Sequence, residues 1–393
     1  MILDKIINIA EFRFPKPDFA NNYEIPLTPL PSPEFMNVPE IYNPIILCII
    51  LALTAFVFYK LRNRKIQIFL IFLVVFVFGF IKNGCLCSIG SIQTISLAIA
   101  DKTYPVTISQ ILIFLIPIIA AIFWGRIFCG AACPIGGIQD ILNYKNFRIP
   151  KPLHELLTLV PFFYLGFAVL YTALNIDFII CSQDPYVGIF RLTFARGAFM
   201  ATLIILLIGL VNARPYCKYI CPYGAILKVF SIFSSKPADI PVDKDCINCD
   251  FCKDVCPTNA IIPPNTKFEK HNISITRLKA CLAISPSIIA IGLIFGLHIG
   301  KGLIIKNPDV ILYNNALPNN NIQILMNNAI NAEKEIKLAT MIFGLYLAAV
   351  TIIKLISLCK VRRNTTYVID KLNCVCCARC YKLCPKNQTK KKV

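Results

Sequence analysis

Histidine is scarce in this sequence: of its 393 residues, only His154, His271 and His298 are histidines. A haem bridged between helices needs ligands at similar membrane depth. His154 lies at the start of the apolar run Leu153–Leu174 and His298 towards the end of the run Ile284–Ile304; the topology argued below places them near the cytoplasmic and the outer face, respectively. Paired haem ligation is therefore disfavoured, and His298 alone is a weak pointer to a quinone site.

Sequence signatures of substrate-converting enzymes are also lacking. We find no glycine-rich phosphate loop after a strand, no hydrolytic triad signature and no flavin-binding motif. A stand-alone catalytic reaction is thus poorly supported. No basic segment followed by a small-residue cleavage site occurs near the N-terminus, so a cleaved signal peptide is not expected.

Acidic side chains are few, with 21 Asp and Glu against 40 Lys and Arg and a net charge of +19. A basic excess can indicate a nucleic-acid partner. Here, however, the basic residues gather on one side of the predicted spans, in segments 60–65, 126–151, 214–279 and 360–392. This is the positive-inside pattern. It predicts a multi-pass cell-membrane protein with its N-terminus outside and its C-terminus in the cytoplasm. A nucleic-acid partner is therefore not expected.

Hydrophobic residues make up 56% of the sequence and form about seven runs that can cross a membrane. The predicted spans are Ile45–Tyr59, Ile66–Ile81, Ile108–Phe128, Leu153–Leu174, Gly197–Val211, Ile284–Ile304 and Ile336–Leu358. The expected fold is an all-α polytopic membrane protein, to which two cytoplasmic segments with the C-x2-C-x2-C-x3-C-P cysteine spacing add small ferredoxin-like modules. Its predicted parts are an extracytoplasmic segment (1–43), a transmembrane core (44–235), a cluster segment (236–282), a hairpin with an Asn-rich outer loop (283–360) and a second cluster segment (361–393).

Cysteine, in contrast, is abundant, with nineteen residues. Two stretches have the C-x2-C-x2-C-x3-C-P spacing of bacterial ferredoxins, which predicts two [4Fe–4S] clusters. Zinc sites and disulfides are the alternatives, but zinc motifs usually pair two C-x2-C units across a longer gap. The ligands are Cys246, Cys249, Cys252 and Cys256 in the first run, and Cys374, Cys377, Cys380 and Cys384 in the second.

The two runs can dock as one module, because the predicted hairpin between them leaves the cytoplasm and returns. Ligation is then either local or crossed. In the crossed form Cys256 serves the cluster of the second run and Cys384 that of the first. Cys376 is out of phase with the motif and has no assigned role.

An internal repeat supplies a further set of thiols. Cys129 and Cys133-Pro134 follow one span, and Cys217 and Cys221-Pro222 follow another, both as C-x3-C-P. Together the four cysteines predict a third [4Fe–4S] cluster at the inner membrane face. The alternatives are helix-end turns with buried cysteines and a thiol–disulfide relay.

Three cysteines are predicted on the outer side: Cys85, Cys87 and Cys181. Because the hydrocarbon core is about 30 Å thick, a transmembrane electron path needs a cofactor nearer the outside. Cys87 and Cys181, which the repeat relates, are candidate ligands for such a cofactor, and a structural disulfide or unpaired thiols are the alternative. The remaining Cys48, Cys281 and Cys359 are expected to be buried structural residues.

The order of C-x3-C-P, C-x3-C-P and a ferredoxin run resembles the NosR/NapH type of membrane-bound polyferredoxin, over roughly residues 80–260 and the C-terminal motif. The resemblance implies electron transfer between the quinone pool or cytoplasmic donors and redox partners outside the membrane. The sequence differs in lacking the large extracytoplasmic flavin-binding domain of NosR-like members, in the hairpin between its runs and in its additional outer cysteines.

We therefore predict a membrane-bound iron–sulfur electron-transfer protein rather than a stand-alone enzyme. Expected partners are membrane lipid, a ferredoxin or flavodoxin inside, a flavin- or haem-type acceptor outside and, as a further candidate, a quinone. Lysines around the runs either attract an acidic carrier or only enforce topology; they are Lys244, Lys253, Lys371 and Lys382. A redox-sensing or assembly factor and a membrane thiol–disulfide exchanger are the rival functions.

Overall fold

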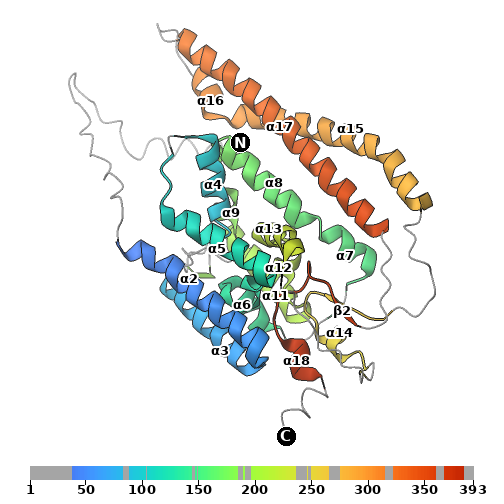
Figure 1. Cartoon of the computed structure of the whole chain (residues 1–393). Helices are drawn as coiled ribbons and strands as arrows, with labels where there is room; N and C mark the ends of the chain where they lie inside the picture. Colours follow the sequence, from blue (N-terminus) through green and yellow to red (C-terminus); the bar gives the residue numbers. More distant parts are fainter. Residues whose placement is uncertain are drawn as a thin grey trace. The chain divides into compact units, whose positions relative to one another are not determined.

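The computed structural model describes residues 38–82, 88–102, 104–143, 147, 149–184, 189–190, 196–235, 246, 249–264, 275–314, 322–359 and 367–384 (Figure 1). All of them belong to one unit, Val38–Val393. Most of the predicted extracytoplasmic segment therefore lies outside the described residues.

The described elements are mainly helices. In the N-terminal half they are α2 (Val38–Phe56), η1 (Val57–Leu61), α3 (Arg64–Val74), η2 (Val75–Ile81), α4 (Ser91–Ala100), α5 (Ile108–Trp124), η3 (Phe128–Ala132), α6 (Pro134–Leu142), α7 (Lys151–Leu157), α8 (Val160–Ala173) and α9 (Ile179–Gln183). In the C-terminal half they are α11 (Arg196–Val211), α12 (Pro215–Tyr219), α13 (Pro222–Phe230), η4 (Ser231–Phe233), α14 (Phe251–Val255), β1 (Ile261–Ile262), α15 (Ile275–Lys306), α16 (Pro308–Asn314), α17 (Ile322–Cys359), β2 (Val368–Ile369) and α18 (Arg379–Leu383).

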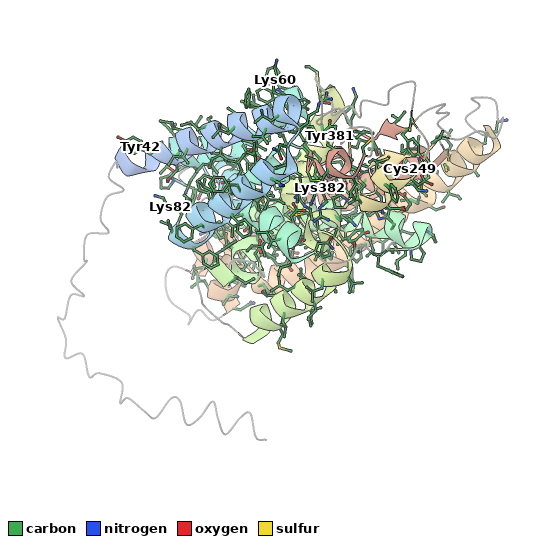
Figure 2. The ribbon with its side chains drawn as sticks, turned by 90° about the horizontal axis from the view of Figure 1, so that it is seen from below. Tyr42, Lys60, Lys82, Cys249, Tyr381 and Lys382 are labelled. Carbon is green, nitrogen blue, oxygen red and sulfur yellow. The ribbon has the colours of Figure 1, made fainter. Side chains whose placement is uncertain are left out.

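The first two spans form a pair that reverses at a left-handed residue. Helix α2 continues into η1, and Arg62 then adopts a φ of 49° while its N–H donates to the Val57 carbonyl at 2.8 Å. This closes the helix end and turns the chain into α3. Tyr42 and Lys82 lie at one end of the pair and Lys60 at the other (Figure 2), as two successive crossings require.

Five of the described helices are long and apolar enough to cross a membrane. They are Tyr42–Leu61, Arg64–Ile81, Pro152–Ala173, Lys279–Lys306 and Leu325–Cys359. The fold class of a helical membrane protein is thus confirmed, but the predicted number of spans is not. The other two predicted spans correspond to α5, with 17 residues, and α11, with 16. Helix α5 ends early because Gly125 adopts a φ of +69°.

The hairpin between the cysteine runs is a close-packed helix pair, α15 and α17 (Figure 1). Gly292, Gly296 and Gly300 recur every four residues, the spacing of small residues that lets membrane helices approach closely. A Cβ atom at Gly292 would lie 2.6 Å from the Gly344 carbonyl oxygen, and one at Gly296 would overlap the Thr340 carbonyl oxygen. The two backbones are therefore in contact along this stripe.

We expect Gly296→Ala to destabilise the hairpin, because the added methyl group has a backbone oxygen in its place and overpacking costs about 1–3 kcal/mol. The matched control is Gly302→Ala on the same helix, where a Cβ atom would meet nothing within 4 Å and alanine improves helix propensity. The thermal midpoint of the full-length protein in detergent should fall for the first variant only. Equal midpoints for both variants would contradict the backbone contact.

Candidate functional site

The two ferredoxin-type runs lie side by side in one small module, although more than a hundred residues separate them in the sequence. Strands β1 and β2 pair antiparallel, with Ile261 opposite Ile369 and Ile262 opposite Val368, and α14 packs against α18. The residue after the second cysteine of each run is left-handed: φ is 57° at Asp250 in the first run and 53° in the second. The same backbone turn thus starts the short helix that carries the third cysteine.

The thiols of the module divide into two groups. Cys256, the last cysteine of the first run, has Cys377 and Cys374 of the second run as electrostatic neighbours. Cys252 instead has Cys249 and Cys246 of its own run. The fourth cysteine of the first run therefore faces the opposite triple, which is the placement that crossed ligation requires. Cys380 completes that triple, and Cys384 follows α18 in a half-buried position.

The environment of Cys256 fits a cluster ligand. Burial raises the pKa of Cys256 to about 11, and its thiol neighbours act in the same direction, so the free thiol is neutral at physiological pH. Coordination to iron provides the positive charge that stabilises the thiolate. The Ala260 N–H points at the Cys256 sulfur at 3.2 Å, and such hydrogen bonds tune cluster potentials.

The four cysteines of the repeat also come together. Cys221 is buried and has Cys217, Cys133 and Cys129 as electrostatic neighbours. In each half the second cysteine precedes a proline that begins a helix, α6 or α13. One of these sulfur atoms has a backbone donor, because the Gly224 N–H lies 3.3 Å from Cys221 Sγ.

Two buried arginines are exchanged between the halves of the repeat. Arg126 lies three residues before Cys129 and Arg214 three residues before Cys217. A Cβ atom at Gly224, in the second half, would lie 3.2 Å from Arg126 Nη2; one at Gly136, in the first half, would lie 3.7 Å from Arg214 Nη1. Each arginine thus passes over the glycine of the other half. The approach is tight at Gly224, and at Gly136 a Cβ atom would be close to the Cys129 carbonyl oxygen, at 3.2 Å, rather than to the arginine.

The same arginines also bear on whether the four thiols of the repeat fit a cluster. The Nε atoms of Arg126 and Arg214 are buried and have no hydrogen-bond partner within the described ranges. Buried polar atoms are rarely left unpaired. Both guanidinium groups flank the four thiols, so these N–H groups are available to the sulfur atoms of a [4Fe–4S] group.

One buried carboxylate, Asp140 on α6, ties the repeat to the second run. Its side chain is fully buried and contacts three arginines: Arg64, Arg214 at 3.2 Å and Arg379 at 2.6 Å. Burial alone would raise the pKa of Asp140, but these guanidinium groups outweigh burial and hold the pKa well below its ordinary value. Because Arg379 belongs to α18, the charge group fixes the module on the membrane core.

Backbone contacts bring the second run directly against the repeat. A Cβ atom at Gly130, between Cys129 and Cys133, would lie 2.8 Å from the Val375 carbonyl oxygen. Arg64 Nη1 donates to the Cys377 carbonyl at 2.7 Å, and Gln67 Nε2 donates to the Cys376 carbonyl at 2.7 Å. The second run and the repeat therefore share an interface, which no motif in the sequence predicted.

Cys376, which the motif left unassigned, lies in this interface. It is buried and left-handed, with a φ of 51°. Its sulfur lies 3.8 Å from the Trp124 carbonyl oxygen and has Cys374 and Cys129 as neighbours. It is thus a packing residue between two candidate cluster sites.

The outer cysteines are only partly described. Cys85 and Cys87 lie outside the described residues. Cys181 is exposed on α9, and its N–H donates to Gln93 Oε1 at 3.1 Å. A link from this region to the repeat is nevertheless visible, since Asp184 accepts a 2.9 Å hydrogen bond from Tyr216, the residue before Cys217.

The expectation for the remaining cysteines was partly wrong. Cys48 is exposed rather than buried, since α2 turns it away from the protein interior. Cys281 and Cys359 have no spaced partner in the sequence, yet their sulfur atoms lie 3.3 Å apart because packing of α15 on α17 brings the helix ends together.

Within the part of the chain that the structure describes, no three Cys, His, Asp or Glu side chains converge on one metal ion. A [4Fe–4S] cluster does not require three side chains to converge on one metal ion, because each of its four thiolates binds a different iron atom.

Comparisons with known proteins agree with the cysteine motifs. Two family models described as 4Fe–4S binding domains match the chain: one at residues 106–152 and 194–240, which include the two halves of the repeat, and one at 240–262, the first ferredoxin run. The chain thus contains 4Fe–4S binding domains.

Several curated proteins are similar over part of the chain. Protein NirI of Paracoccus denitrificans is 25% identical over 51% of this chain and 32% of its own length. Regulatory protein NosR of Stutzerimonas stutzeri is 25% identical over 50% of this chain and 29% of its own length. YccM of Escherichia coli, provisionally named an electron transport protein, is 28% identical over 43% of this chain and 51% of its own length. This chain covers about a third of the first two. No solved structure matches. The resemblance to NosR/NapH-type membrane polyferredoxins is confirmed.

We expect Asp140→Asn to weaken the attachment of the second run, because three arginines, two of them buried, would lose their carboxylate; breaking a buried ion pair costs about 3–5 kcal/mol. Thermal unfolding of the full-length protein is the measurement. Glu333→Gln is the control, since it removes only the exposed Glu333–Lys337 pair, which contributes below about 1 kcal/mol.

The pH dependence has a definite sign. A carboxylate with a lowered pKa stabilises the fold above its unfolded pKa of about 4 and loses that contribution only as the pH falls through the lowered value. The difference between wild type and Asp140→Asn should therefore stay constant between about pH 5 and 8. A difference that shrank within this window would contradict an ionised Asp140.

Proposed function

We propose that this protein, a membrane polyferredoxin of NosR/NapH type, conducts electrons between a cytoplasmic or quinone-side donor and an acceptor at the opposite face of the membrane. The observation that carries the proposal is the contact of Gly130 with the Val375 carbonyl. It joins the backbone between Cys129 and Cys133 to the backbone between Cys374 and Cys377. Two candidate cluster sites thus share an interface.

Three cluster sites follow from the thiol groups. We assign Cys246, Cys249 and Cys252 with Cys384 to one, Cys374, Cys377 and Cys380 with Cys256 to the second, and Cys129, Cys133, Cys217 and Cys221 to the third. The crossed assignment of Cys256 rests on its neighbours Cys377 and Cys374. When bound, each [4Fe–4S] cluster supplies a one-electron station.

The residues around the sites have two roles: some face an incoming carrier, and others donate hydrogen bonds to sulfur. Cys246 is exposed, so the first run is the accessible end of the module. Lys253 of the same run pairs with Asp250 at 3.6 Å and would exchange this partner for an acidic carrier such as a ferredoxin or flavodoxin. Side chains of the core donate to sulfur: Gln139 Nε2 lies 3.4 Å from Cys217 Sγ and Arg126 Nη2 lies 3.9 Å from Cys129 Sγ. These donors stabilise the added negative charge of a reduced site.

A cofactor at Cys87 and Cys181 would extend the path outwards to a flavin- or haem-type acceptor. The Tyr216–Asp184 hydrogen bond joins the residue before Cys217 to the end of α9, the helix that carries Cys181, so such a cofactor would lie close to the core site rather than a full membrane thickness from it. The N-terminus outside and the C-terminus in the cytoplasm complete the proposed topology.

A redox-sensing role is the second candidate. One similar protein, NosR, is named a regulatory protein. A sensor needs reducible clusters but no sustained flux, so steady turnover between a reduced donor and an external acceptor separates the two functions. Thiol trapping of Cys87 and Cys181 in opposite redox states would instead favour a thiol–disulfide exchanger.

Anaerobically purified protein should contain about twelve irons per chain, as three cubanes give, with reducible EPR signals at low temperature. Cys217→Ser should lose about four of them, because it removes one ligand of the core site. Cys48→Ser is the matched control, since Cys48 is exposed on α2 and outside every thiol group. About eight irons in the wild type would contradict the third site.

The outward cofactor has its own test. The double variant Cys87→Ser, Cys181→Ser should lose one spectroscopic signal while keeping the irons of the three inner sites. Iron analysis and EPR on the same sample measure both. If the double variant has the spectrum of the wild type, these cysteines bind no cofactor.

A further inference from the structure

Cys281 on α15 and Cys359 on α17 form a thiol pair outside every proposed cluster site. Their sulfur atoms lie 3.3 Å apart, although 78 positions separate the two residues in the sequence. A disulfide bond is about 2.05 Å long, so the sulfur atoms need to come only about 1 Å closer to form one. The pair is therefore within reach of a covalent bond that no motif in the sequence indicates.

The glycine stripe of the hairpin sets this pairing. A Cβ atom at Gly292 would lie 3.1 Å from the Ala348 Cβ atom. Cys281 lies eleven residues before Gly292, Cys359 lies eleven residues after Ala348, and both stretches are helical throughout. Eleven residues are about three turns of an α-helix. In two antiparallel helices the cysteines therefore continue the same two facing stripes, and close packing of the backbones holds the thiols opposite each other.

Both thiols lie at the water-facing ends of their spans. The Lys279–Lys306 span begins two residues before Cys281, and the Leu325–Cys359 span ends at Cys359 itself. Lys279 is exposed, and Lys360 directly follows Cys359 in the sequence. Charged side chains of this kind mark the boundary between membrane and water. A small water-soluble reagent can thus approach the pair without entering the hydrocarbon core.

The two cysteines differ in exposure. Cys281 is partly exposed, whereas Cys359 is buried. In thiol–disulfide exchange the first thiol has to meet the incoming disulfide, and the second thiol has to reach only the sulfur of the first. The exposures therefore assign attack to Cys281 and resolution to Cys359.

We propose that Cys281 and Cys359 are a redox-active dithiol, which a low-molecular-weight disulfide such as glutathione disulfide converts to an intramolecular disulfide. The Cys281 thiolate attacks one sulfur of the oxidant, forming a mixed disulfide and releasing one thiolate. The Cys359 thiolate then attacks Cys281 Sγ, forming the Cys281–Cys359 bond and releasing the second thiolate. The two cysteines lose two electrons and two protons in all, and the oxidant takes up both as it becomes two thiols.

The bond would join the two ferredoxin-type runs by a second covalent path. Cys281 lies 25 residues after Cys256, and Cys359 lies 15 residues before Cys374. The proposed topology places these helix ends in the cytoplasm, where thiols are kept reduced. The dithiol is therefore the resting state, and the bond forms when the disulfide fraction of the thiol pool rises. The proposal does not depend on the electron-transfer function.

The test uses full-length protein in detergent, kept anaerobic and treated with glutathione disulfide. Trypsin releases each cysteine on a peptide with no second cysteine, because it cuts after lysine: Cys281 on Ala280–Lys301 and Cys359 on Leu355–Lys360. Mass spectrometry without reduction should find these two peptides joined in the wild type. Dithiothreitol should separate them again.

Single variants test the order of attack. Cys359→Ser should retain glutathione on Cys281, roughly tenfold more than the wild type does, because the intramolecular step that removes it is lost. Cys281→Ser should leave Cys359 unmodified, since Cys359 is buried. Iron content measured on the same samples should equal that of the wild type, which shows that the variants fold and that no cluster ligand was consumed.

The matched geometric control is Cys359→Ser combined with Leu358→Cys. It moves the thiol one position along α17, about 100° around the helix, to a side chain that is exposed. This variant should keep glutathione on Cys281 and form no joined peptides. Cys48→Ser, which removes an exposed cysteine of α2, should behave like the wild type.

Three results would overturn the proposal. One is a wild type that accumulates glutathione on Cys281 without joined peptides. Another is a wild type in which neither cysteine reacts. The third is joining in the Leu358→Cys control as extensive as in the wild type, since collision of mobile helix ends would then form the bond.

Discussion

The contact of Asp140 with three arginines is the interaction on which the arrangement of the sites depends. Its carboxylate joins α3, α6, the start of α12 and α18 at one buried point. Burying several charges is favourable only when the geometry pairs them all, and removing one partner leaves an uncompensated charge. The relative positions of the repeat and the second ferredoxin run are therefore fixed by electrostatics as well as by packing.

The exchange of Arg126 and Arg214 explains why the two halves must fold together. Each half has the pattern R-x-x-C-x3-C-P-x-G, and the glycine of one half leaves room for the arginine of the other. A side chain at Gly224 would press on the buried Arg126 guanidinium group, and one at Gly136 would press on the Cys129 carbonyl oxygen. Neither half therefore builds a complete site alone, and the four thiols face each other as a consequence of the exchange.

The sequence allowed the ligands to be predicted, but not the contacts that arrange them. Spacing alone located the two ferredoxin runs, since cluster ligation imposes it locally, and the hairpin between them followed from hydropathy. The Arg64–Asp140 pair joins residues 76 positions apart, and no local period records such a pair. Some signals were present and unused: Arg126 and Arg214 occupy equivalent positions before their cysteines, and Gly292, Gly296 and Gly300 are evenly spaced. The span predicted at Ile108–Phe128 was too long, because Gly125 ends α5 inside an apolar run.

Charge also couples the folding of the core to cluster insertion. Three arginines surround one carboxylate at Asp140, and Arg126 adds a further buried cation, so this region has an excess of positive charge when the thiols are protonated. Burial favours the protonated form of two of these thiols, because it raises the pKa of Cys217 to about 11 and raises that of Cys221 as well. A [4Fe–4S] group with four thiolates is an anion, and it offsets that excess. If the core thiols bind the cluster proposed for them, the form without that cluster should have the less stable interface between α18 and the repeat.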